Sequence, residues 1–565
     1  MNNREAVNNR EALSNREALN YREAAQAWIA QDPDDETRAE LTALLDDEAA
    51  LAERFGTRLA FGTAGLRGEL GAGPNRMNRV LVAQAAAGFA AWLLARGGSP
   101  SVVIGYDGRK NSAVFASDTA EIMQGAGVAA TLLNRALPTP VLAFAVRHLG
   151  TSAGVMVTAS HNPAADNGYK VYLGGLDGGS QIVAPADAEI ETAILAVAPV
   201  NELLRSKHYQ TAGDDLVKAY VTKTAALRTG TEAAPRFVYT PMHGVGWETA
   251  KAVFAAAGLG APDVVAEQLH PDPTFPTVSF PNPEEEGALD LALALAKKTN
   301  ADLMIANDPD ADRLAVALPF DGEWRRLSGN EVGALLGWRA ALRLENEDVT
   351  NTGHANHRTL AASVVSSPAL KEIARKFNLD YVETLTGFKW ISRVGGLAYG
   401  YEEALGYLVD AEKVRDKDGI SAAVDFLALA AELAASGTTF AQHQAHFDGF
   451  FGAYASGQIS VRVDDLAAID VTMQRFRHDP PTQLAGVAVE SIDDFSDGFG
   501  HFGPTDLLRF WVGDSARVIV RPSGTEPKLK VYIDTWSRNG TPSERRAEAE
   551  ALVAALEAEL KALLA

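Results

Sequence analysis

Four short stretches of this 565-residue sequence carry side chains that could do chemistry, and the first is centred on Ser160. The apolar run 155–157 indicates a buried strand, and the polar stretch 158–163 (Thr-Ala-Ser-His-Asn-Pro) follows it directly. Open α/β sheets bind ligands at the carboxyl ends of their strands. Pro163 disfavours a helical conformation at the residue before it, which favours a tight loop around the serine. Ser160 and His161 are therefore candidate catalytic residues, although a strand-to-turn transition with incidental hydroxyls gives the same pattern.

The second stretch is Asn307-Asp308-Pro-Asp310-Ala-Asp312-Arg313, which follows the apolar run 302–306. Three carboxylates at alternating positions of an extended loop would point the same way, because side chains alternate along an extended chain. Such converging charges are costly unless a cation lies among them, and oxygen ligands suit Mg²⁺ or Ca²⁺. An EF-hand loop needs glycine at 313 and glutamate at 319, which the sequence lacks. We predict a metal site here, rather than a solvated acidic turn, and Arg313 could bind a phosphate beside it.

The third stretch combines Leu385-Thr386-Gly387-Phe-Lys389 with Gly400-Tyr-Glu402-Glu403-Ala404-Leu-Gly406. A pair of glutamates between glycines could bind sugar hydroxyls, and Lys389 could act on a phosphate or on a proton. Either motif alone is weak, because polar turns of this kind are common in structural loops.

The fourth stretch, Arg521-Pro-Ser523-Gly524-Thr525-Glu-Pro-Lys528, interrupts two predicted strands near the C-terminus. Its backbone N–H groups and hydroxyls, flanked by an arginine and a lysine, are what a phosphate dianion requires. We therefore predict a phosphate-binding loop. Two further positively charged residues are candidate catalytic residues. Arg67 lies in a glycine-rich turn (61–68), and Lys170 lies at the mouth of a predicted strand.

The elements that must position these loops alternate between strand and helix. The predicted strands are 102–106, 128–133, 155–157, 236–239 and 302–306, and the predicted helices are 80–96, 113–125, 141–149, 215–228, 287–299 and 330–343. Alternation of this kind predicts doubly wound sheets with parallel strands. The β-rich region 511–534 and a terminal helix, 542–565, predict instead a compact α+β domain at the end of the chain.

The composition limits the classes of function. A net charge of −22 argues against a nucleic-acid partner, which needs a basic face, but it allows small basic pockets. The chain has no cysteine, which excludes disulfides and thiolate chemistry. No long apolar run predicts a membrane span, and no signal peptide is evident, so we expect a cytoplasmic protein.

The length of the chain predicts several domains. Asn-Arg-Glu-Ala repeats begin at Asn3, Asn9 and Asn15, and a related unit begins at Tyr21. Their period of six residues forms no single apolar stripe, so we expect a solvated helical extension, followed by one amphipathic helix at 31–51. The predicted divisions are the extension 1–45 and four domains at 46–206, 207–322, 323–457 and 458–565.

Taken together and in this order, the four stretches resemble the α-D-phosphohexomutases, the family of phosphoglucomutases and phosphomannomutases. The resemblance covers the chain from about residue 52 to the C-terminus and includes the turn 61–68 and the stretches 105–109 and 239–244. It implies four domains around one cleft, three of related α/β/α topology with mixed sheets and a TATA-binding-protein-like α+β fourth domain.

The resemblance also implies the chemistry. Ser160 would carry a phosphate, and Mg²⁺ would be bound by that phosphate and by Asp308, Asp310 and Asp312. A sugar phosphate would then be converted through a bisphosphate, for which glucose 1,6-bisphosphate serves as intermediate and activator. The other implied contacts are Glu402, Glu403, Thr386 and Gly387 for the sugar, Arg313, Arg521, Ser523, Gly524, Thr525 and Lys528 for phosphate, and His161, Arg67, Lys170 and Lys389 near the reaction, with Lys170 or Lys389 for proton transfer.

One departure from the family leaves the sugar open. Many members have serine two places after the first glutamate, where this sequence has Ala404, and this form resembles the branch with phosphopentomutases and glucose 1,6-bisphosphate-forming members. We expect a phosphoglucomutase, with pentose phosphate and then mannose phosphate as alternatives. We expect the chain to be a monomer or a homodimer.

Other classes compete with this interpretation. A Mg²⁺-dependent phosphatase would use Ser160 with water as the acceptor, and a sugar-phosphate sensor would bind without turnover. A serine hydrolase is disfavoured, because adjacent residues rarely align as nucleophile and base and no Gly-x-Ser-x-Gly surrounds Ser160.

Overall fold

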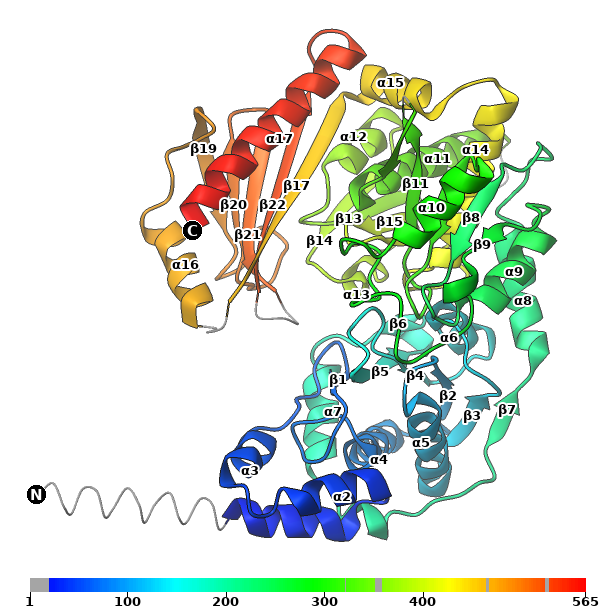
Figure 1. The fold of residues 1–565 in the computed structure, drawn as a ribbon, viewed down its shortest axis with the longest axis vertical. Coiled ribbons are helices and arrows are strands. Elements are labelled where there is room, and N and C mark those ends of the chain that lie inside the picture. The colour runs from blue at the N-terminus through cyan, green and yellow to red at the C-terminus, as the bar shows by residue number, and fades with distance from the viewer. Residues whose placement is uncertain (1–19, 321, 351–357, 464–466, 524–527, 565) are drawn as a thin grey trace, which may run out of the picture. The chain divides into compact units, whose positions relative to one another are not determined.

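The computed structural model describes residues 20–320, 322–350, 358–463, 467–523 and 528–564 (Figure 1). The Asn-Arg-Glu-Ala units at Asn3, Asn9 and Asn15 lie outside the described residues. The chain forms two compact units. Unit 1 consists of Met1–Thr229, Arg236–Ala317 and Asp410–Val424, and unit 2 of Gly230–Pro235, Leu318–Val409 and Asp425–Ala565.

The first sheet of unit 1 is mixed, with strand order β1-β5-β4-β2-β3-β7 and β6 paired to β5. Strands β2, β3, β4 and β7 run parallel, whereas β5 is antiparallel to β4 and to β1. The strands are β1 (Leu66–Glu69), β2 (Ser101–Tyr106), β3 (Ala129–Leu133), β4 (Ala153–Val157), β5 (Asp166–Leu173), β6 (Ser180–Gln181) and β7 (Gln210–Ala212). Lys170 lies within β5 rather than at its mouth, and β7 extends this sheet past residue 206.

Helices cover both faces of this sheet because its strands alternate apolar side chains to either side. Val102 and Ile104 of β2 join the core formed with α4, α5 and α7, whereas α6 packs on the other face against β2 and β4. The helices are α4 (Arg79–Ala95), α5 (Ser112–Ala126), α6 (Thr139–His148) and α7 (Ala186–Leu195), with short 3₁₀ turns at Gly175–Asp177 and Val200–Glu202.

The predicted single helix at 31–51 is wrong, because the structure has two helices there. Residues 20–31 are helical, then α2 (Asp35–Ala43) and α3 (Glu48–Phe55) follow. Asp34 and Asp47 begin the two helices by accepting a hydrogen bond from a backbone N–H with their side chains, which is the capping that favours aspartate at a helix start. Trp28 and Leu41 pack with α4 in one core, so this part of the predicted extension is folded.

The second sheet has the strand order β12-β11-β10-β8-β9, in which β12 is Glu323–Arg326. Strands β8, β9 and β10 are parallel, and β11 is antiparallel to β10. The elements are α8 (Asp214–Ala225), β8 (Phe237–Thr240), α9 (Gly246–Ala256), β9 (Asp263–Val264), a 3₁₀ turn at Ala266–Gln268, α10 (Asp290–Thr299), β10 (Leu303–Ala306) and β11 (Ala315–Phe320). The predicted strands 236–239 and 302–306 are thus confirmed within a residue or two.

The segment Asp410–Val424 packs in unit 1, although the chain before and after it belongs to unit 2. Two buried tyrosines hold it: Tyr172 donates to Asp416 at 2.8 Å and Tyr220 donates to Asp418 at 2.8 Å. The buried Lys413 ammonium lies 3.0 Å from Asp418. These contacts pair buried polar groups of β5 and α8 with buried polar groups of the segment, so the segment is built into unit 1.

Unit 2 contains a third mixed sheet, with order β14-β13-β15-β16, and a fourth, antiparallel sheet, with order β17-β22-β21-β20-β19-β18. The third sheet and its helices comprise α11 (Gly329–Thr350), β13 (Thr359–Ser363), α12 (Ala369–Lys376), β14 (Asp380–Thr384), α13 (Phe388–Ile391), β15 (Leu397–Glu402), β16 (Gly406–Leu408), α14 (Gly419–Ala435) and α15 (Phe440–Phe451). The C-terminal part comprises β17 (Ala453–Arg462), α16 (Ala467–His478), β18 (Gln483–Leu484), β19 (Val487–Asp494), β20 (Leu508–Val512), β21 (Ala516–Pro522), β22 (Lys528–Ser537) and α17 (Pro542–Leu564).

A group of buried charges joins these two sheets within unit 2, and we call Arg509, Arg517, Glu383 and Asp534 the arginine cluster. Arg509 donates to Glu383 at 2.9 Å and Arg517 donates to the other oxygen of the same carboxylate at 3.2 Å. Arg517 also donates to Asp534 at 3.0 Å, and Ser456 donates to the second Asp534 oxygen at 2.7 Å. Apolar packing around Val364 and Ile519 completes this contact between the sheets.

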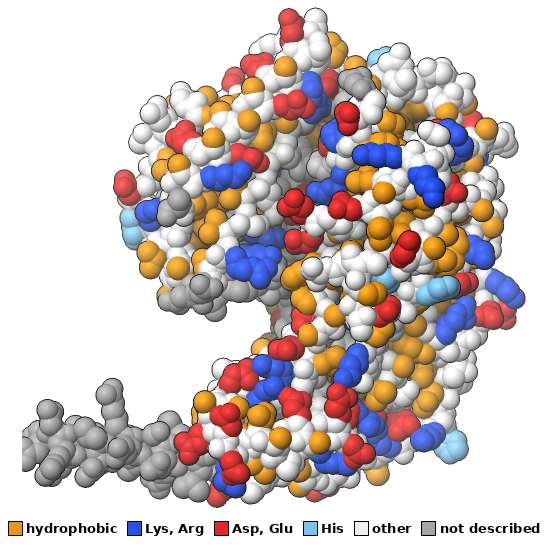
Figure 2. All heavy atoms as spheres, in the orientation of Figure 1, with side chains coloured by type: hydrophobic (Ala, Val, Ile, Leu, Met, Phe, Trp, Pro, Cys, Tyr) orange, Lys and Arg blue, Asp and Glu red, His pale blue; other side chains and the backbone are white. Residues whose placement is uncertain are grey.

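The mixed sheets and the antiparallel C-terminal sheet agree with the predicted α/β fold of three related domains and one α+β domain. Among the described helices, none alone is long and apolar enough to cross a membrane, and α14 and α15 meet that test only as a pair bent by 99°. Acidic and basic side chains are interspersed over the face seen in Figure 2.

Candidate active site

Ser160 lies in a strained turn directly after β4, as the sequence predicts. Its φ of 50° is in the left-handed region, which residues with a β-carbon adopt rarely and at a cost. The Thr158 hydroxyl accepts from the Ser160 backbone N–H at 2.8 Å. The Ser160 hydroxyl itself donates to Asp308 Oδ2 at 2.9 Å and is 3 % exposed. The first and second stretches therefore meet, 148 residues apart in the chain.

Asp308, Asp310 and Asp312 converge, and we call them the acidic cluster. Each offers a carboxylate oxygen, and these oxygens all lie within 4.8 Å of one another. Their convergence does not come from the predicted extended loop. The chain turns at Ala311, whose φ is 57° and whose N–H donates to the Asp308 carbonyl at 2.8 Å. The prediction of three converging carboxylates is confirmed, but its geometrical reason is wrong.

In both Asp310 and Asp312, Oδ2 has protein partners, whereas Oδ1 has none among the described residues. Asp310 Oδ2 accepts from Thr139 at 2.6 Å and from Lys170 at 2.8 Å, and Asp312 Oδ2 lies 3.2 Å from Lys170 and 3.3 Å from Lys417. Among the described residues, none donates to Oδ1 of Asp310 or to Oδ1 of Asp312, although both atoms are buried. Two buried oxygens without a donor, on carboxylates that converge within 4.8 Å, form a donor set that fits a divalent cation with oxygen ligands.

The pKa shifts follow from burial and from the neighbouring charges. Burial raises the pKa of Asp308 well above its ordinary value, and the carboxylates of Asp310 and Asp312 raise it further. Burial also acts to raise the pKa of Asp310, but the Lys170 ammonium outweighs burial and holds it below its ordinary value. The acidic cluster is therefore only partly neutralised by the protein.

His161 contacts Ser160 after all, with Nδ1 at 3.2 Å from the hydroxyl oxygen. On its other side Nε2 faces the Arg313 guanidinium at 3.5 Å, and an arginine can only donate. The tautomer that fits both contacts has the proton on Nδ1, so His161 donates to Ser160 and cannot accept its proton. Burial lowers the pKa of His161 well below its ordinary value, and the positive charges of Arg313 and Arg67 lower it further. The pair is not arranged as the nucleophile and base of a hydrolase.

Close backbone packing supports the loop of the acidic cluster. Tyr239 donates to Asn307 at 2.8 Å, and Asn307 donates to the Arg313 carbonyl at 2.6 Å. A β-carbon on Gly244 would lie 2.3 Å from the Pro309 backbone, and one on Gly419 would lie 2.1 Å from the Arg313 carbonyl oxygen. Only glycine allows these approaches, so the loop is fixed from two directions.

The remaining predicted residues of unit 1 lie around this centre. Arg67 donates to the Asn162 side chain at 3.2 Å, and Asn162 donates in turn to Asp166 at 2.9 Å. Unit 1 thus brings together the predicted residues Ser160, His161, Lys170, Arg67, Arg313, Asp308, Asp310 and Asp312.

The other predicted residues belong to unit 2. Thr386 and Gly387 precede α13, which contains Lys389, and Glu402 ends β15. Glu403 accepts from the hydroxyls of Ser363 and Ser366, both at 3.1 Å, so one of its oxygens is held within unit 2. Arg521 and Ser523 stand at the end of the β21 hairpin arm and Lys528 begins β22. Gly524 and Thr525 lie outside the described residues.

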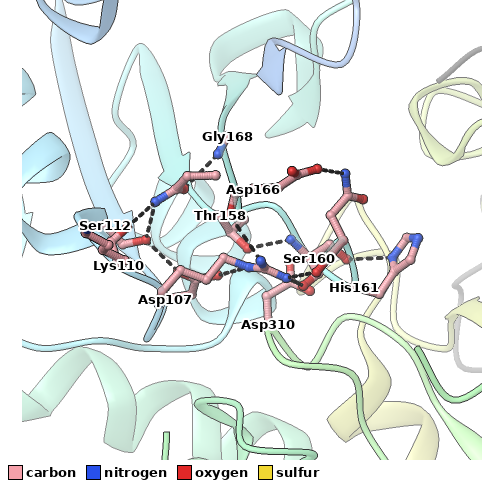
Figure 3. A network of polar contacts seen from close by, with 12 residues as sticks. Asp107, Lys110, Ser112, Thr158, Ser160, His161, Asp166, Gly168 and Asp310 are labelled. Atoms are coloured by element: carbon pink, nitrogen blue, oxygen red, sulfur yellow. Dashed lines mark hydrogen bonds and ion pairs between the residues drawn. The ribbon is translucent and has the colours of Figure 1, made fainter. Parts of the chain in front are cut away.

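The sequence analysis missed three residues at this centre: Thr139, Lys417 and Arg109. Thr139 and Lys417 contact the acidic cluster from α6 and from the segment 410–424. Arg109 donates to carbonyl oxygens of the loop in which Figure 3 labels Ser160, His161 and Asp166. For Arg109, the sequence offered one signal, the turn Asp107-Gly-Arg109 at the end of a predicted strand. The strand before Ser160 is parallel to it, so both ends lie at the same edge of the sheet.

Four family models match consecutive parts of the chain. They describe phosphoglucomutase/phosphomannomutase α/β/α domain I at residues 58–200, domain II at 218–319, domain III at 328–448 and the C-terminal domain at 459–551.

Individual proteins match along most of their length. A Haemophilus influenzae protein named probable phosphomannomutase is 54% identical over 472 residues, 83% of this chain and 95% of that protein. A mouse phosphopentomutase is 35% identical and covers 94% of this chain and 93% of its own length. A Staphylococcus aureus phosphoglucomutase is 32% identical and covers 86% and 91%. A solved phosphoglucomutase/phosphomannomutase family protein from Burkholderia thailandensis has the same fold, with a TM-score of 0.66 at 19% identity over 90% of this chain and 98% of that one.

Proposed function

Because the chain belongs to the phosphoglucomutase/phosphomannomutase family, whose members are isomerases that move a phosphate within a sugar, we propose that it is a magnesium-dependent phosphoglucomutase. It would interconvert glucose 1-phosphate and glucose 6-phosphate through a phosphoserine at Ser160 and through glucose 1,6-bisphosphate. The observation that carries the proposal is the Ser160 hydroxyl 2.9 Å from an acidic cluster that keeps two buried carboxylate oxygens without donors among the described residues.

Asp308, Asp310 and Asp312 would hold Mg²⁺ together with the phosphate on Ser160. The cation supplies positive charge that neutralises a phosphoryl group in transfer. Lys170 binds Oδ2 of Asp310 and Oδ2 of Asp312, which would leave Oδ1 of each carboxylate for the cation. Arg313 lies beside both Asp308 and His161, Arg67 contacts the Ser160 loop at Asn162, and these three side chains (Arg313, Arg67 and His161) would contact the phosphate.

The phosphoryl step needs one bond to form and one to break. The phosphorus of phosphoserine 160 is attacked by the free hydroxyl of the sugar phosphate, the bond to Ser160 Oγ breaks, and a bisphosphate forms. The proton of the sugar hydroxyl passes to a basic group. Lys389 is the remaining candidate, because the Lys170 ammonium is paired with Asp310 and Asp312, and these carboxylates raise its pKa. After the bisphosphate has turned over, its other phosphate returns to Ser160 and the isomeric monophosphate leaves.

The residues of unit 2 would recognise the parts of the substrate that do not react. Glu402 is the glutamate we assign to the sugar hydroxyls, with Glu403 bound to Ser363 and Ser366 and acting behind it. Thr386 and Gly387 would complete the sugar contacts. The hairpin residues Arg521, Ser523, Gly524, Thr525 and Lys528 would bind the phosphate that is not being transferred.

Phosphopentomutase is the second candidate function, and Ala404 is the observation that favours it. A serine at this position would offer a hydroxyl to a hexose, and alanine offers none. The mouse phosphopentomutase is similar over 94% of the chain, whereas the name of the Haemophilus relative favours mannose phosphate, our third candidate.

The test is turnover of glucose 1-phosphate, ribose 1-phosphate and mannose 1-phosphate with Mg²⁺ and a trace of glucose 1,6-bisphosphate. The highest kcat/KM on glucose 1-phosphate supports the proposal, and a clear preference for either other sugar replaces it with that mutase. Release of inorganic phosphate without isomerisation favours a phosphatase instead. Ser160→Ala should be inactive with an unchanged melting temperature, and turnover by that variant contradicts the phosphoserine.

Three expectations remain predictions beside this one: a monomer or homodimer, a cytoplasmic location, and the division into an N-terminal extension and four domains at 46–206, 207–322, 323–457 and 458–565. Light scattering on the purified chain measures the first.

A further inference from the structure

Arg109 is buried at the end of β2 and binds the loop that carries Ser160. Its Nη2 donates to the carbonyl oxygens of Ser160 and Asn162, both at 2.6 Å. Its Nη1 donates to the carbonyl oxygens of Pro163 at 2.7 Å and Asp166 at 3.1 Å. One guanidinium therefore donates to four backbone carbonyl oxygens within the seven residues 160–166.

Neighbouring residues fix the guanidinium itself. The Asp107 carboxylate lies 3.5 Å from Arg109 Nε, accepts from the Arg109 backbone N–H at 3.0 Å and accepts from Ser112 at 2.7 Å. On its face the guanidinium lies 5.0 Å from the centre of the Phe275 ring, which comes from the proline-rich loop that follows β9. With 4 % of Arg109 exposed, the guanidinium has little freedom to swing away.

The loop needs such support because Ser160 is strained. A left-handed φ at a residue with a β-carbon persists only where surrounding contacts over-determine it. Within the turn, the Ser160 backbone N–H has the Thr158 hydroxyl as acceptor, and its carbonyl oxygen has Arg109 as donor. Arg109 thus fixes the carbonyl group of Ser160, the residue whose hydroxyl donates to Asp308.

We propose that Arg109 is a positioning residue, which acts through the backbone of the Ser160 loop to hold the serine hydroxyl in line with the acidic cluster. The inference rests on the proposed mutase function and adds a residue to it. A planar guanidinium can reach acceptors on two sides of its fork, whereas the compact ammonium of lysine cannot span them all. The loop therefore depends on the shape of this side chain as well as on its charge.

The test compares Arg109→Ala and Arg109→Lys with the wild type, using the mutase reaction that the wild type catalyses best. A small displacement of a reacting group can cost about 10²-fold in rate, so we expect kcat to fall by about that factor for Arg109→Ala. We expect KM for the sugar phosphate to change by less than about threefold, because Arg109 does not contact the substrate. Arg109→Lys should recover only a small part of the loss.

Chemical rescue separates positioning from a general loss of folding. Millimolar guanidinium should raise kcat of Arg109→Ala at least severalfold by occupying the vacated site, and should leave the wild type and Ser160→Ala unchanged. Backbone amides from 159 to 166 should exchange with deuterium faster in Arg109→Ala, and guanidinium should slow them again. Unchanged kcat, or unchanged exchange in this loop, overturns the proposal.

Arg147→Ala is the matched control. Arg147 also donates to backbone carbonyls, those of Gly178 and Glu412, but it does not contact the Ser160 loop. It should lose stability without losing kcat, and a kcat loss equal to that of Arg109→Ala would make the effect non-specific and overturn the proposal. If Arg109→Ala does not fold, Asp107→Asn provides the second variant, since it loosens Arg109 and should lower kcat severalfold at constant KM; an unchanged kcat overturns the proposal.

The failure of this proposal is distinct from the failure of the proposed function. A wild type that turns over no sugar phosphate removes the mutase assignment. A wild type that turns over sugar phosphate, with a fully active Arg109→Ala, removes only the role of Arg109.

Discussion

The acidic cluster of unit 1 and the arginine cluster of unit 2 both contain buried charged side chains, and they differ in how their hydrogen bonds are satisfied. In the arginine cluster of unit 2, both oxygens of Glu383 and both oxygens of Asp534 accept from an arginine or a serine. In the acidic cluster of unit 1, Asp310 and Asp312 each keep one buried oxygen that no described residue serves. Burial and charge are common to both, so they do not identify a site.

What separates the clusters is the remaining binding capacity. A complete set of partners stabilises one arrangement and needs nothing more, whereas buried oxygens without donors are costly until a ligand fills them. The comparison implies that mutations in the acidic cluster should affect function more than stability, and mutations in the arginine cluster the reverse.

Asp310→Asn tests the expectation that the acidic cluster affects function more than stability, and it should have the largest effect. Loss of one carboxylate charge should lower kcat by about 10²–10³-fold, a loss typical of removing one electrostatic contact to a transition state. Stability without Mg²⁺ should fall as well, because the Asp310 carboxylate is paired with the Lys170 ammonium and its pKa lies below the ordinary value, but relief of repulsion from Asp308 and Asp312 offsets part of this loss. Steady-state kinetics against Mg²⁺ concentration and thermal unfolding measure both quantities.

The matched control for this variant is Asp263→Asn, which changes an exposed aspartate of the same unit. A strongly destabilised Asp310→Asn with normal kcat would break the comparison.

Glu383→Gln tests the expectation that the arginine cluster affects stability more than function. It leaves Arg509 and Arg517 facing a neutral group, and removing one partner of a buried ion pair costs about 3 kcal/mol or more. The free energy of unfolding, measured with urea, should fall by that amount, while Mg²⁺ affinity measured by calorimetry should not change.

Glu557→Gln is the control for the arginine cluster, because its pair with Lys561 on α17 is partly exposed and should contribute little. Equal losses in the two variants would mean that the arginine cluster has no special structural role.

Gly244→Ala sharpens the comparison by moving the acidic cluster without changing its charges. The new methyl group would meet the Pro309 backbone, so the loop must shift, at a cost of about 1–3 kcal/mol in stability. Mg²⁺ affinity should fall at the same time, as measured by calorimetry.

Gly395→Ala has open space around the new methyl group and should change neither quantity. If Gly244→Ala lost stability but kept its Mg²⁺ affinity, the loop would not be the metal site.

His443, a half-buried histidine of unit 2, lies outside both clusters. Burial lowers the pKa of His443 to about 4, with a further contribution from His446. The unfolded chain takes up this proton near pH 6.5, so its contribution is complete above that pH and is lost as the pH falls toward 4. We expect a loss of about 2 kcal/mol, after allowance for partial exposure.

Urea unfolding of the wild type and of His443→Phe between pH 4.5 and 7.5 measures this contribution. The phenylalanine keeps a ring beside Trp338, which stacks on His443 at 4.7 Å, and should show the smaller pH dependence. Identical pH profiles of the two proteins would show that His443 does not cause the loss of stability at low pH.

Much of the fold could be predicted from the sequence because local pattern determines it. Apolar runs that end in glycine or polar residues identified β2, β4 and β10, and the chemistry follows these strands directly. The single helix predicted at 31–51 failed because two aspartates that look like ordinary surface residues are helix caps.

The candidate site could be predicted only in part, because its assembly depends on contacts that are distant in sequence. The three aspartates were identified by their spacing, but the turn at Ala311 was not. Arg109 contacts a loop 51 residues away, and Lys417 reaches Asp312 from a segment assigned by sequence to another domain. Such contacts have no local signature in one sequence.

The segment Asp410–Val424 has a consequence for the order in which the protein can be made. Unit 1 draws this segment from beyond residue 409, so a nascent chain that ends at residue 317 lacks the acceptors for Tyr172 and Tyr220. The ribosome must add about a hundred more residues, most of the third sheet of unit 2 among them, before unit 1 can close. Neither unit corresponds to one continuous piece of the gene, so a gene fragment cut between them would encode an incomplete core.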